Sequence, residues 1–359
     1  MSVQPMSMKR RALIAGAAAL GLPPVRSARA ADGLEATLLI RSTGGAFEAA
    51  LRKNFFDPFS KATGVRVIPF AASYGDMMAK AAAMQAAGKV EWDIISPQYS
   101  ELSQISKYLA DLGDCSAMPN VAKEGVAGTC GRYGVLYLTG AQCLTWNPDI
   151  YGTKAPQGWA DFFDTKAFPG RRALPNTGSP WATLILAALA DGVPRDKLFP
   201  MDLDRVFRKL DTIKPDVATW WRTGDQSQKM WNGDDIAMSL MWSGSAFAAK
   251  RRGTPLAWTY NQAIADFGAW CILKDAPHPK AARAFIDFYM ANPEAHAAFS
   301  REIGYTTSNK ASPALLNPEE KQDLISSPER LAGIVTVDYD WLATNRDAVL
   351  NRFNAWVSS

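Results

Sequence analysis

Short apolar runs and longer amphipathic segments alternate in the first third of the chain. Three apolar runs, 36–40, 65–70 and 92–96, have the length and composition of β-strands. The two segments between them, about 46–62 and 73–87, are expected to be helices. This order of strand, helix, strand, helix, strand predicts a parallel, doubly wound half-domain of α/β architecture.

A further apolar run, 236–242, has one polar break at Ser239 and ends at Trp242, just before a Ser-Gly-Ser turn. Such a run is typical of a buried strand in an α/β sheet. A Trp at the carboxyl end of such a strand is expected to face the crevice where open α/β sheets bind ligands. The remaining pattern predicts strands at 172–175 and 258–270 and helices at 181–191, 204–213 and 279–290.

Loops that follow the first three strands should meet at one edge of the sheet. Thr43 and Gly44 follow the first strand, Tyr74 the second, and Gln98 and Tyr99 the third. Because the carboxyl ends of parallel strands share an edge, we expect these residues to converge on one crevice. The helix after the glycine pair would present free N–H groups to an anionic group. Alternatively, the pair is a tight turn without ligand contact.

Residues 1–30 have the three-part pattern of an export signal. They contain no acid, a basic cluster at 9–11 precedes the apolar run 12–22, and Ala28-Arg29-Ala30 offers a small-x-small cleavage site. The apolar run is too short to span a bilayer. We therefore expect export to the periplasm with cleavage near Ala30, by either the general or the twin-arginine route. A disordered basic tail is the alternative, although it would not need the small-x-small ending.

Removal of the signal changes the charge balance. The whole chain has 39 Lys and Arg against 35 Asp and Glu, and five of the basic residues lie within 1–30. The remaining chain therefore has 34 basic and 35 acidic residues, a net charge of −1. No basic patch is left to suggest binding of nucleic acid or an anionic membrane. A remaining length of roughly 330 residues predicts two domains.

The four cysteines fit an exported protein. Cys115 and Cys130 flank a loop that contains Gly and Pro, and we expect a disulfide to close it. Cys143 and Cys271 lie within apolar strands, where buried thiols are the usual state.

A series of short motifs follows the order and spacing of a known family. The motifs are GGAF at 44–47, FDPF at 56–59, TGVRV at 63–67, WDII at 92–95, WN at 146–147, WADFF at 159–163, FPGR at 168–171, WSGSA at 242–246, GTP at 253–255 and IGY at 303–305. With them, nearly the whole chain after the signal resembles the solute-binding proteins of ABC importers, and in particular the spermidine/putrescine-binding family.

The resemblance implies a two-lobed periplasmic-binding-protein fold of type II, with the ligand cleft between the lobes. The chain would cross the hinge twice, near 145–146 and near 242–243. Lobe one would comprise 34–145 and 242–305, and lobe two 146–241 and 306–359. Such a protein closes around a small solute and delivers it to an ABC permease in the inner membrane, without making or breaking bonds. It is expected to be a monomer without a cofactor.

The resemblance also implies an aromatic box for a cation, which attracts the ligand through cation–π contacts. Tyr99 matches the family position after the third strand, and Trp242 matches the hinge Trp. Trp221 and Tyr260 occupy similar places. Trp242 has hinge packing as its alternative role.

The acidic part of the family site is reduced in this chain. Asp266 and Asp225 are the only acids near the expected cleft, and the crevice loop of lobe two, 173–183, contains none. From that loop we expect Asn176, Thr177 and Ser179 to face the ligand.

Two ligand classes remain open at this point. A polyamine such as putrescine or spermidine is the family default. A zwitterionic ω-amino acid or aminophosphonate is the alternative, because the guanidinium of Arg222 beside Trp221 could clamp a carboxylate or phosphonate. Arg222 could instead be a surface residue paired with Asp225.

An enzyme is disfavoured. His278 and His296 are the only histidines, and neither lies near a nucleophile motif. No His, Cys and Asp cluster has metal-ligand spacing, so we expect no metal. The adjacent Tyr-Tyr pair that ferric-ion binders of this broader fold use is missing.

Overall fold

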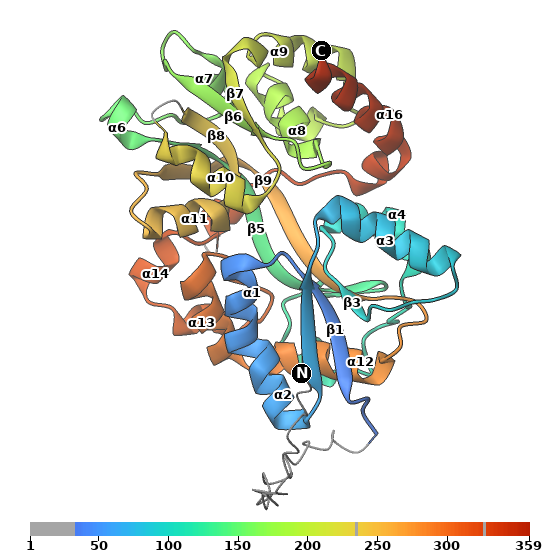
Figure 1. Ribbon diagram of the computed structural model, residues 1–359. Helices are drawn as coiled ribbons and strands as arrows, with labels where there is room; N and C mark the ends of the chain where they lie inside the picture. The colour runs from blue at the N-terminus through green and yellow to red at the C-terminus, as the bar shows by residue number, and fades with distance from the viewer. Residues whose placement is uncertain (1–32, 234–235, 326–327) are drawn as a thin grey trace, which may run out of the picture.

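The computed structural model describes residues 33–233, 236–325 and 328–359; the predicted export signal lies outside them (Figure 1). The strands are β1 (Thr37–Ser42), β2 (Arg66–Ala71), β3 (Ile94–Ile95), β4 (Cys130–Gly131), β5 (Gly134–Trp146), β6 (Arg171–Pro175), β7 (Val217–Trp221), β8 (Ile236–Trp242), β9 (Ala257–Ile272) and β10 (Thr306–Thr307). The α-helices are α1 (Gly45–Leu51), α2 (Asp57–Thr63), α3 (Tyr74–Ala86), α4 (Leu102–Ile105), α5 (Pro119–Glu124), α6 (Pro148–Tyr151), α7 (Trp159–Phe163), α8 (Trp181–Ala190), α9 (Leu203–Asp211), α10 (Gly224–Lys229), α11 (Ser243–Arg251), α12 (Pro279–Ala291), α13 (Pro293–Ile303), α14 (Pro318–Gln322), α15 (Pro328–Gly333) and α16 (Tyr339–Ser358).

Local sequence signals fix several of these boundaries. The Ser73 hydroxyl accepts the backbone N–H of Asp76 at 3.0 Å, which caps the start of α3. Gly64 ends α2 in the left-handed conformation, with φ of 74°, where a side chain would be strained. A π-helical turn, Arg52–Phe56, joins α1 to α2, so the predicted helix 46–62 is one continuous helical path.

The strands form one sheet in the order β2-β1-β3-β9-β5-β8-β6-β7, with β10 and β4 also paired to β5. β1 lies parallel to β2 and β3, and β6 lies parallel to β7 and β8. The predicted parallel half-domain of the first third is therefore confirmed. The long strands β5 and β9 pair with each other in antiparallel fashion and join the two parallel regions.

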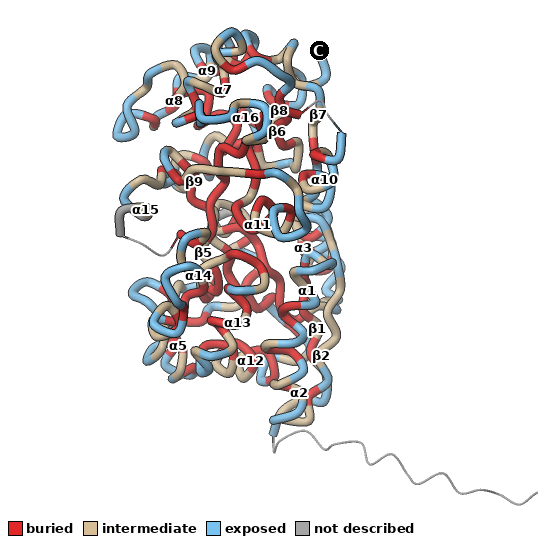
Figure 2. The backbone as a smooth tube through the Cα atoms, turned by 90° about the vertical axis from the view of Figure 1, so that its left-hand side faces the viewer, coloured by how far each residue is buried: buried red, intermediate tan, exposed pale blue. Residues whose placement is uncertain are grey.

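The buried residues divide into two main cores. One core includes β1, β3, α12 and α13, and the other includes α8, α9 and α16. β5 and β9 contribute to both, because Val135 and Trp270 lie in the first core while Leu144 and Ile264 lie in the second. Figure 1 shows β5 and β9 running between a lower and an upper body, and Figure 2 shows β5 as a mainly buried path between them. These bodies correspond to the two expected lobes.

The chain passes between the bodies once more near its C-terminus. The backbone N–H of Val335 donates to the Ala263 carbonyl at 2.7 Å, and the Val335 carbonyl accepts the N–H of Ala265 at 2.9 Å. The segment 333–337 therefore runs beside β9 on its way to α16. Three segments, β5, β9 and 333–337, connect the bodies.

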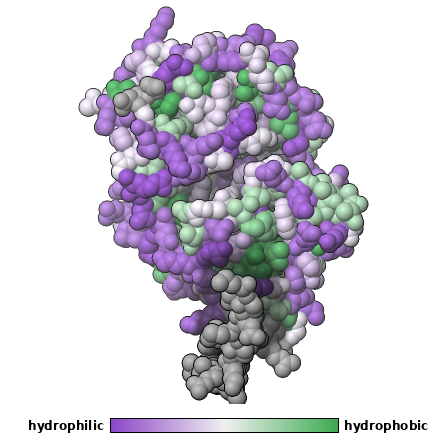
Figure 3. Space-filling view, in the orientation of Figure 1, coloured by the Kyte–Doolittle hydropathy of each residue, from purple (hydrophilic) through white to green (hydrophobic). Residues whose placement is uncertain are grey.

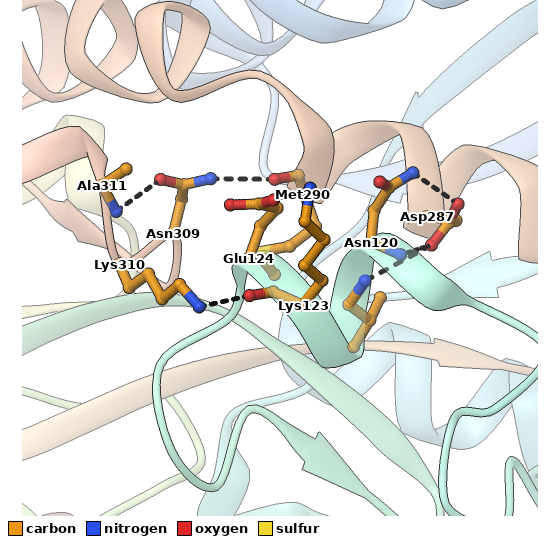
Figure 4. Close-up of polar contacts among 9 residues, drawn as sticks. Asn120, Lys123, Glu124, Asp287, Met290, Asn309, Lys310 and Ala311 are labelled. Atoms are coloured by element: carbon orange, nitrogen blue, oxygen red, sulfur yellow. Dashed lines mark hydrogen bonds and ion pairs between the residues drawn. The ribbon is translucent and has the colours of Figure 1, made fainter.

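Residues 306–325, which the sequence-based division assigns to lobe two, pack against lobe one. β10 pairs with Thr139 and Leu138 of β5, close to the first core. Figure 4 shows the cause: Asn309 donates to the Met290 carbonyl at 2.8 Å, and Lys310 bonds the Lys123 carbonyl. These side chains hold the segment against α12 and α5.

Lobe one also carries the disulfide. Cys115 and Cys130 are bonded to each other and tie the segment that contains α5 to β4. Cys143 and Cys271 are buried free thiols. Over the described ranges, we find no helix whose length and apolar content would let it cross a bilayer.

Candidate functional site

A narrow cleft, with about 20 Å³ of free volume, lies between the two bodies, beside the middle of β9. The lower body contributes the segment after β3, and the upper body contributes the start of α8 and the start of α16. Figure 3 shows the two bodies from the side of Figure 1, with mainly hydrophilic residues on their surfaces. The cleft is lined by Gln98, Tyr99, Ser100, Gln142, Ser179, Trp181, Ala182, Ile264, Ala265, Asp266, Phe267, Val337 and Tyr339.

Asp266 supplies the acid of this cleft. It lies in β9 opposite Gly140 of β5, and its two carboxylate oxygens accept hydrogen bonds of 2.9 and 3.1 Å from the Gln98 side chain. Burial raises the pKa of Asp266 to about 7, and the nearby carboxylate of Glu101 also raises it. The side chains of Gln98 and Trp242 lower the pKa of Asp266. Asp266 is therefore close to half-protonated at neutral pH.

Glu101 is a second acid near the cleft, and the sequence analysis did not select it. It is buried at the end of a 3-10 turn, Tyr99–Glu101, where it accepts the backbone N–H of Gln98 at 3.1 Å. Burial raises the pKa of Glu101 to about 7, while the Gln98 hydrogen bond and the positive charges of Arg41 and Arg346 lower it. The Gln-x-x-Glu spacing of a capping box was the sequence signal that could have identified Glu101.

Arg41 places a positive charge behind these acids, and it too was missed. Its side chain is 1 % exposed and donates to the carbonyls of Ala72 and Ser96 at 3.0 and 3.1 Å. The guanidinium lies 4.6 Å from the ring centroid of Tyr74. Tyr74 therefore supports Arg41 and is not among the residues that line the cleft. Burial raises the pKa of Tyr74 well above its usual value, so its hydroxyl stays protonated.

Aromatic side chains approach the cleft from both bodies. Tyr99 of the lower body and Tyr339 at the start of α16 contact edge to face, with ring centroids 5.2 Å apart. Trp242 is half-buried, and its side chain acts to lower the pKa of Asp266. It packs against Trp221, with the ring centroids 4.8 Å apart. Trp221 itself is buried and donates to the Leu240 carbonyl, so it belongs to the core. Tyr339 was missed because its place depends on the late return of the chain.

The upper wall of the cleft contains no acid. Ser179 lies there with Trp181 and Ala182, the first residues of the ten-residue helix α8. The first turn of a helix has N–H groups without helical partners and carries a partial positive charge. This wall therefore suits a carboxylate or another anionic group. Asn176 and Thr177 lie earlier in the same loop and are half-buried outside the lining, with the Asn176 N–H donating to Trp221 at 2.7 Å.

Several predicted residues lie away from the cleft wall. Thr43 is exposed, and Gly44 has φ of 73° in the turn before α1, which supports the tight-turn interpretation. Arg222 is also exposed and does not line the cleft. Asp225, its expected partner, pairs with Lys229 at 2.7 Å, because these two residues are one turn apart on α10.

Tyr260 was also expected in the cleft but lines a separate cavity, where its hydroxyl donates to the Asp323 carbonyl at 2.8 Å. Of the predicted residues, the structure thus brings Gln98, Tyr99, Ser179 and Asp266 together on the cleft wall.

The histidines have structural roles. His278 bonds Asp93 at 2.9 Å and the Thr37 hydroxyl at 3.1 Å, which fastens the start of α12 to β1. His296 is buried and bonds the Tyr289 carbonyl at 2.7 Å. Burial lowers the pKa of His296 to about 4. Within the described part of the chain, no three His, Cys, Asp or Glu side chains form a group that could hold a metal ion.

Comparisons with known proteins agree with this geometry. Residues 54–328 match the family model described as bacterial extracellular solute-binding protein. The gamma-aminobutyric acid-binding protein of Pseudomonas aeruginosa is 32% identical over 337 residues, which cover 92% of this chain and 94% of that protein. The spermidine/putrescine-binding periplasmic protein of Escherichia coli is 25% identical over 199 residues, 55% of this chain and 56% of that protein.

A solved structure supports the fold. An ABC transporter substrate-binding protein from Bradyrhizobium japonicum superimposes with a TM-score of 0.81 at 31% identity, covering 90% of this chain and 99% of that one. The chain belongs to the family of bacterial extracellular solute-binding proteins.

Proposed function

We propose that this protein captures a small solute with one ammonium and one carboxylate group, such as the ω-amino acid 4-aminobutyrate, and delivers it to an ABC permease. The similarity to a gamma-aminobutyric acid-binding protein extends over nearly the whole chain and supports this ligand class. The likeness to an ABC transporter substrate-binding protein supports the delivery step.

The observation that carries the proposal is the one-sided distribution of charge in the cleft. Asp266 lies on the lower wall with Gln98, and Glu101 lies behind it. The opposite wall consists of Ser179 and the start of α8 and has no acid. A ligand with a positive and a negative end would therefore lie with its ammonium toward Asp266 and its carboxylate toward α8.

At the ammonium end, the aromatic residues would complete the site. Trp242 lowers the pKa of Asp266 and so favours the ionised carboxylate, while Tyr99 and Tyr339 bring two rings to the same space. Ring faces attract an ammonium by cation–π interaction, and the effect grows when water is excluded. At the carboxylate end, Ser179 supplies a hydroxyl beside the helix N–H groups. This arrangement does not require Arg222, whose side chain is exposed.

A polyamine is the second candidate ligand, and Glu101 favours it. Two carboxyl groups near one cleft could each hold an amine. The similarity to the spermidine/putrescine-binding protein supports this candidate over about half of the chain. The upper wall without acid would leave the far amine of a polyamine without a charged partner.

Calorimetric titration with 4-aminobutyrate, 2-aminoethylphosphonate, putrescine and spermidine tests the proposal. We expect 4-aminobutyrate to bind most tightly, and Asp266→Asn and Ser179→Ala to weaken it. Asp225→Asn removes an exposed carboxylate outside the cleft and should leave the affinity unchanged. Tighter binding of putrescine than of both zwitterions would contradict the proposal and would identify a polyamine as the ligand.

We also propose that the protein is located in the periplasm. The export pattern at 1–30 and the family description support export to the periplasm, with the signal removed near Ala30. N-terminal sequencing of protein isolated from the periplasm tests the cleavage site.

A further inference from the structure

Gln142 of β5 lines the ligand cleft but has no part in the binding scheme described so far. Its side chain is 9% exposed. Within the ranges that the structure describes, no protein group forms a hydrogen bond with its amide. Gln98, the other glutamine of the cleft wall, instead uses its amide to hold Asp266. Because polar groups taken out of water are normally paired, the unpaired amide of Gln142 is available to a ligand.

The strand register places Gln142 on the same face of the sheet as Asp266. Asp266 of β9 lies opposite Gly140 of β5, and Gln142 is two residues further along β5. Residues opposite each other on paired strands point to one face of a sheet, and so do residues two apart on one strand. The two side chains therefore lie side by side on the cleft wall.

Gln142 lies on the side of Asp266 that is nearer the upper body. β5 runs upward from Val135 in the first core to Leu144 in the second (Figure 1). The wall without an acid, Ser179 and the start of α8, also belongs to the upper body. Gln142 therefore stands between the acid that would hold an ammonium and the wall that would receive a carboxylate.

The spacing along β5 fits a short ω-amino acid. Two strand residues span roughly 6.6 Å. At about 1.5 Å per bond, an extended chain of three methylene groups places an ammonium nitrogen about 5 Å from the carboxylate carbon. The cleft has about 20 Å³ of free volume, which is too little for such a solute, so the bodies must separate to admit it.

We propose that Gln142 binds the carboxylate of the solute through its amide N–H groups, while Asp266 binds the ammonium. This assignment rests on the function proposed above and adds the residue that selects the ligand class. The amide oxygen could accept from an ammonium, but Asp266 attracts that group more strongly because it carries the negative charge. A carboxylate at position 142 would repel the ligand carboxylate and attract a second ammonium. The amide of Gln142 thus favours a zwitterion over a diamine.

Calorimetric titration at pH 8 with 4-aminobutyrate and putrescine tests the assignment. Gln142→Leu keeps a similar size without a donor, so it should weaken 4-aminobutyrate roughly 10- to 100-fold and putrescine less than about threefold. Gln142→Glu should reverse the preference, so that putrescine binds more tightly than 4-aminobutyrate. Gln157→Leu changes an exposed glutamine outside the cleft and should leave both affinities unchanged. Thermal unfolding of each variant verifies that it is folded.

A shorter amide gives a second test, which keeps the polar character of the site. Gln142→Asn withdraws the amide by one methylene group, so the preference should move from 4-aminobutyrate toward the longer 5-aminopentanoate. An unchanged preference between these two ligands would contradict the assignment.

The outcomes separate this assignment from the proposed function. If the wild-type protein binds 4-aminobutyrate and Gln142→Leu binds it equally well, the function stands and the assignment of Gln142 is wrong. Retention of the wild-type preference by Gln142→Glu has the same meaning. If the wild-type protein binds no zwitterion, the proposed function fails and the assignment fails with it.

Discussion

The pH dependence of ligand affinity tests the role of the buried carboxyl groups most directly. Burial raises the pKa values of Asp266 and Glu101 to about 7, and the nearby Glu101 carboxylate adds to the shift of Asp266. An ammonium group stabilises the ionised form of a carboxyl, so the ligand should bind better as pH rises. A ligand such as 4-aminobutyrate keeps both of its own charges between pH 5.5 and 8. The change in affinity over this range therefore reports the ionisation of groups on the protein.

The magnitude follows from the ionised fraction of Asp266. If binding requires the ionised form, the affinity falls about tenfold for each pH unit below about 7, and each factor of ten is about 1.4 kcal/mol. From pH 8 to pH 5.5 the affinity should therefore fall roughly 30-fold. At pH 7 the bound ligand should release about half a proton, because Asp266 is then about half-ionised.

Calorimetry in two buffers of different ionisation enthalpy measures both the affinity and the proton release. Glu101→Gln should shift the profile to lower pH, because it removes the negative charge that raises the pKa of Asp266. Asp266→Asn should give weak binding that is nearly independent of pH. An affinity that is constant from pH 5.5 to 8, without proton release, would refute the assignment of Asp266 as the partner of the ammonium.

Three further predictions concern other parts of the molecule. Trp242→Ala should weaken ligand binding roughly 5- to 30-fold, the size of a cation–π contact of about 1–2 kcal/mol, while Trp258→Ala in the other cavity should leave calorimetric affinity unchanged. Opening the Cys115–Cys130 disulfide with a Cys→Ser pair should reduce the free energy of unfolding by about 3 kcal/mol in urea titrations, because the bond closes a loop of 15 residues; an unchanged midpoint would contradict this. Burial lowers the pKa of His296 to about 4, below its unfolded value, so stability should be lost as pH falls from about 6.5 through about 4. An NMR titration should show His296 uncharged above pH 5, and a midpoint near 6.5 would contradict its burial.

The sequence predicted the parallel strands and part of the cleft because both follow from short-range patterns. Tyr99 comes directly after a strand that the apolar run identifies, and strand ends meet at one edge of the sheet. Local geometry explains why Arg222 does not pair with Asp225, the alternative role considered for it. Arg222 precedes α10, whose spacing pairs Asp225 with Lys229, so the expected partner of Arg222 is already engaged.

The residues that were missed depend on contacts over long distances in the chain. Tyr339 reaches Tyr99 only because the segment 333–337 runs beside β9. Arg41 ends in the interior because carbonyls of Ala72 and Ser96 accept its N–H groups, and no pattern around residue 41 indicates that. The same dependence explains the lobe assignment of 306–325, which Asn309 and Lys310 hold against α12 and α5.

The contacts across the cleft connect ligand binding to closure of the lobes. Tyr339 and Arg346 both belong to α16 of the upper body, and they approach Tyr99 and Glu101 of the lower body. The positive charge of Arg346 favours the ionised form of Glu101, whereas Asp266 lies buried beside a second carboxyl. Removing a carboxylate from water is costly unless a positive group accompanies it. An ammonium at Asp266 supplies that group, so the ligand stabilises the closed form more than the open form, and this difference in affinity is what drives closure.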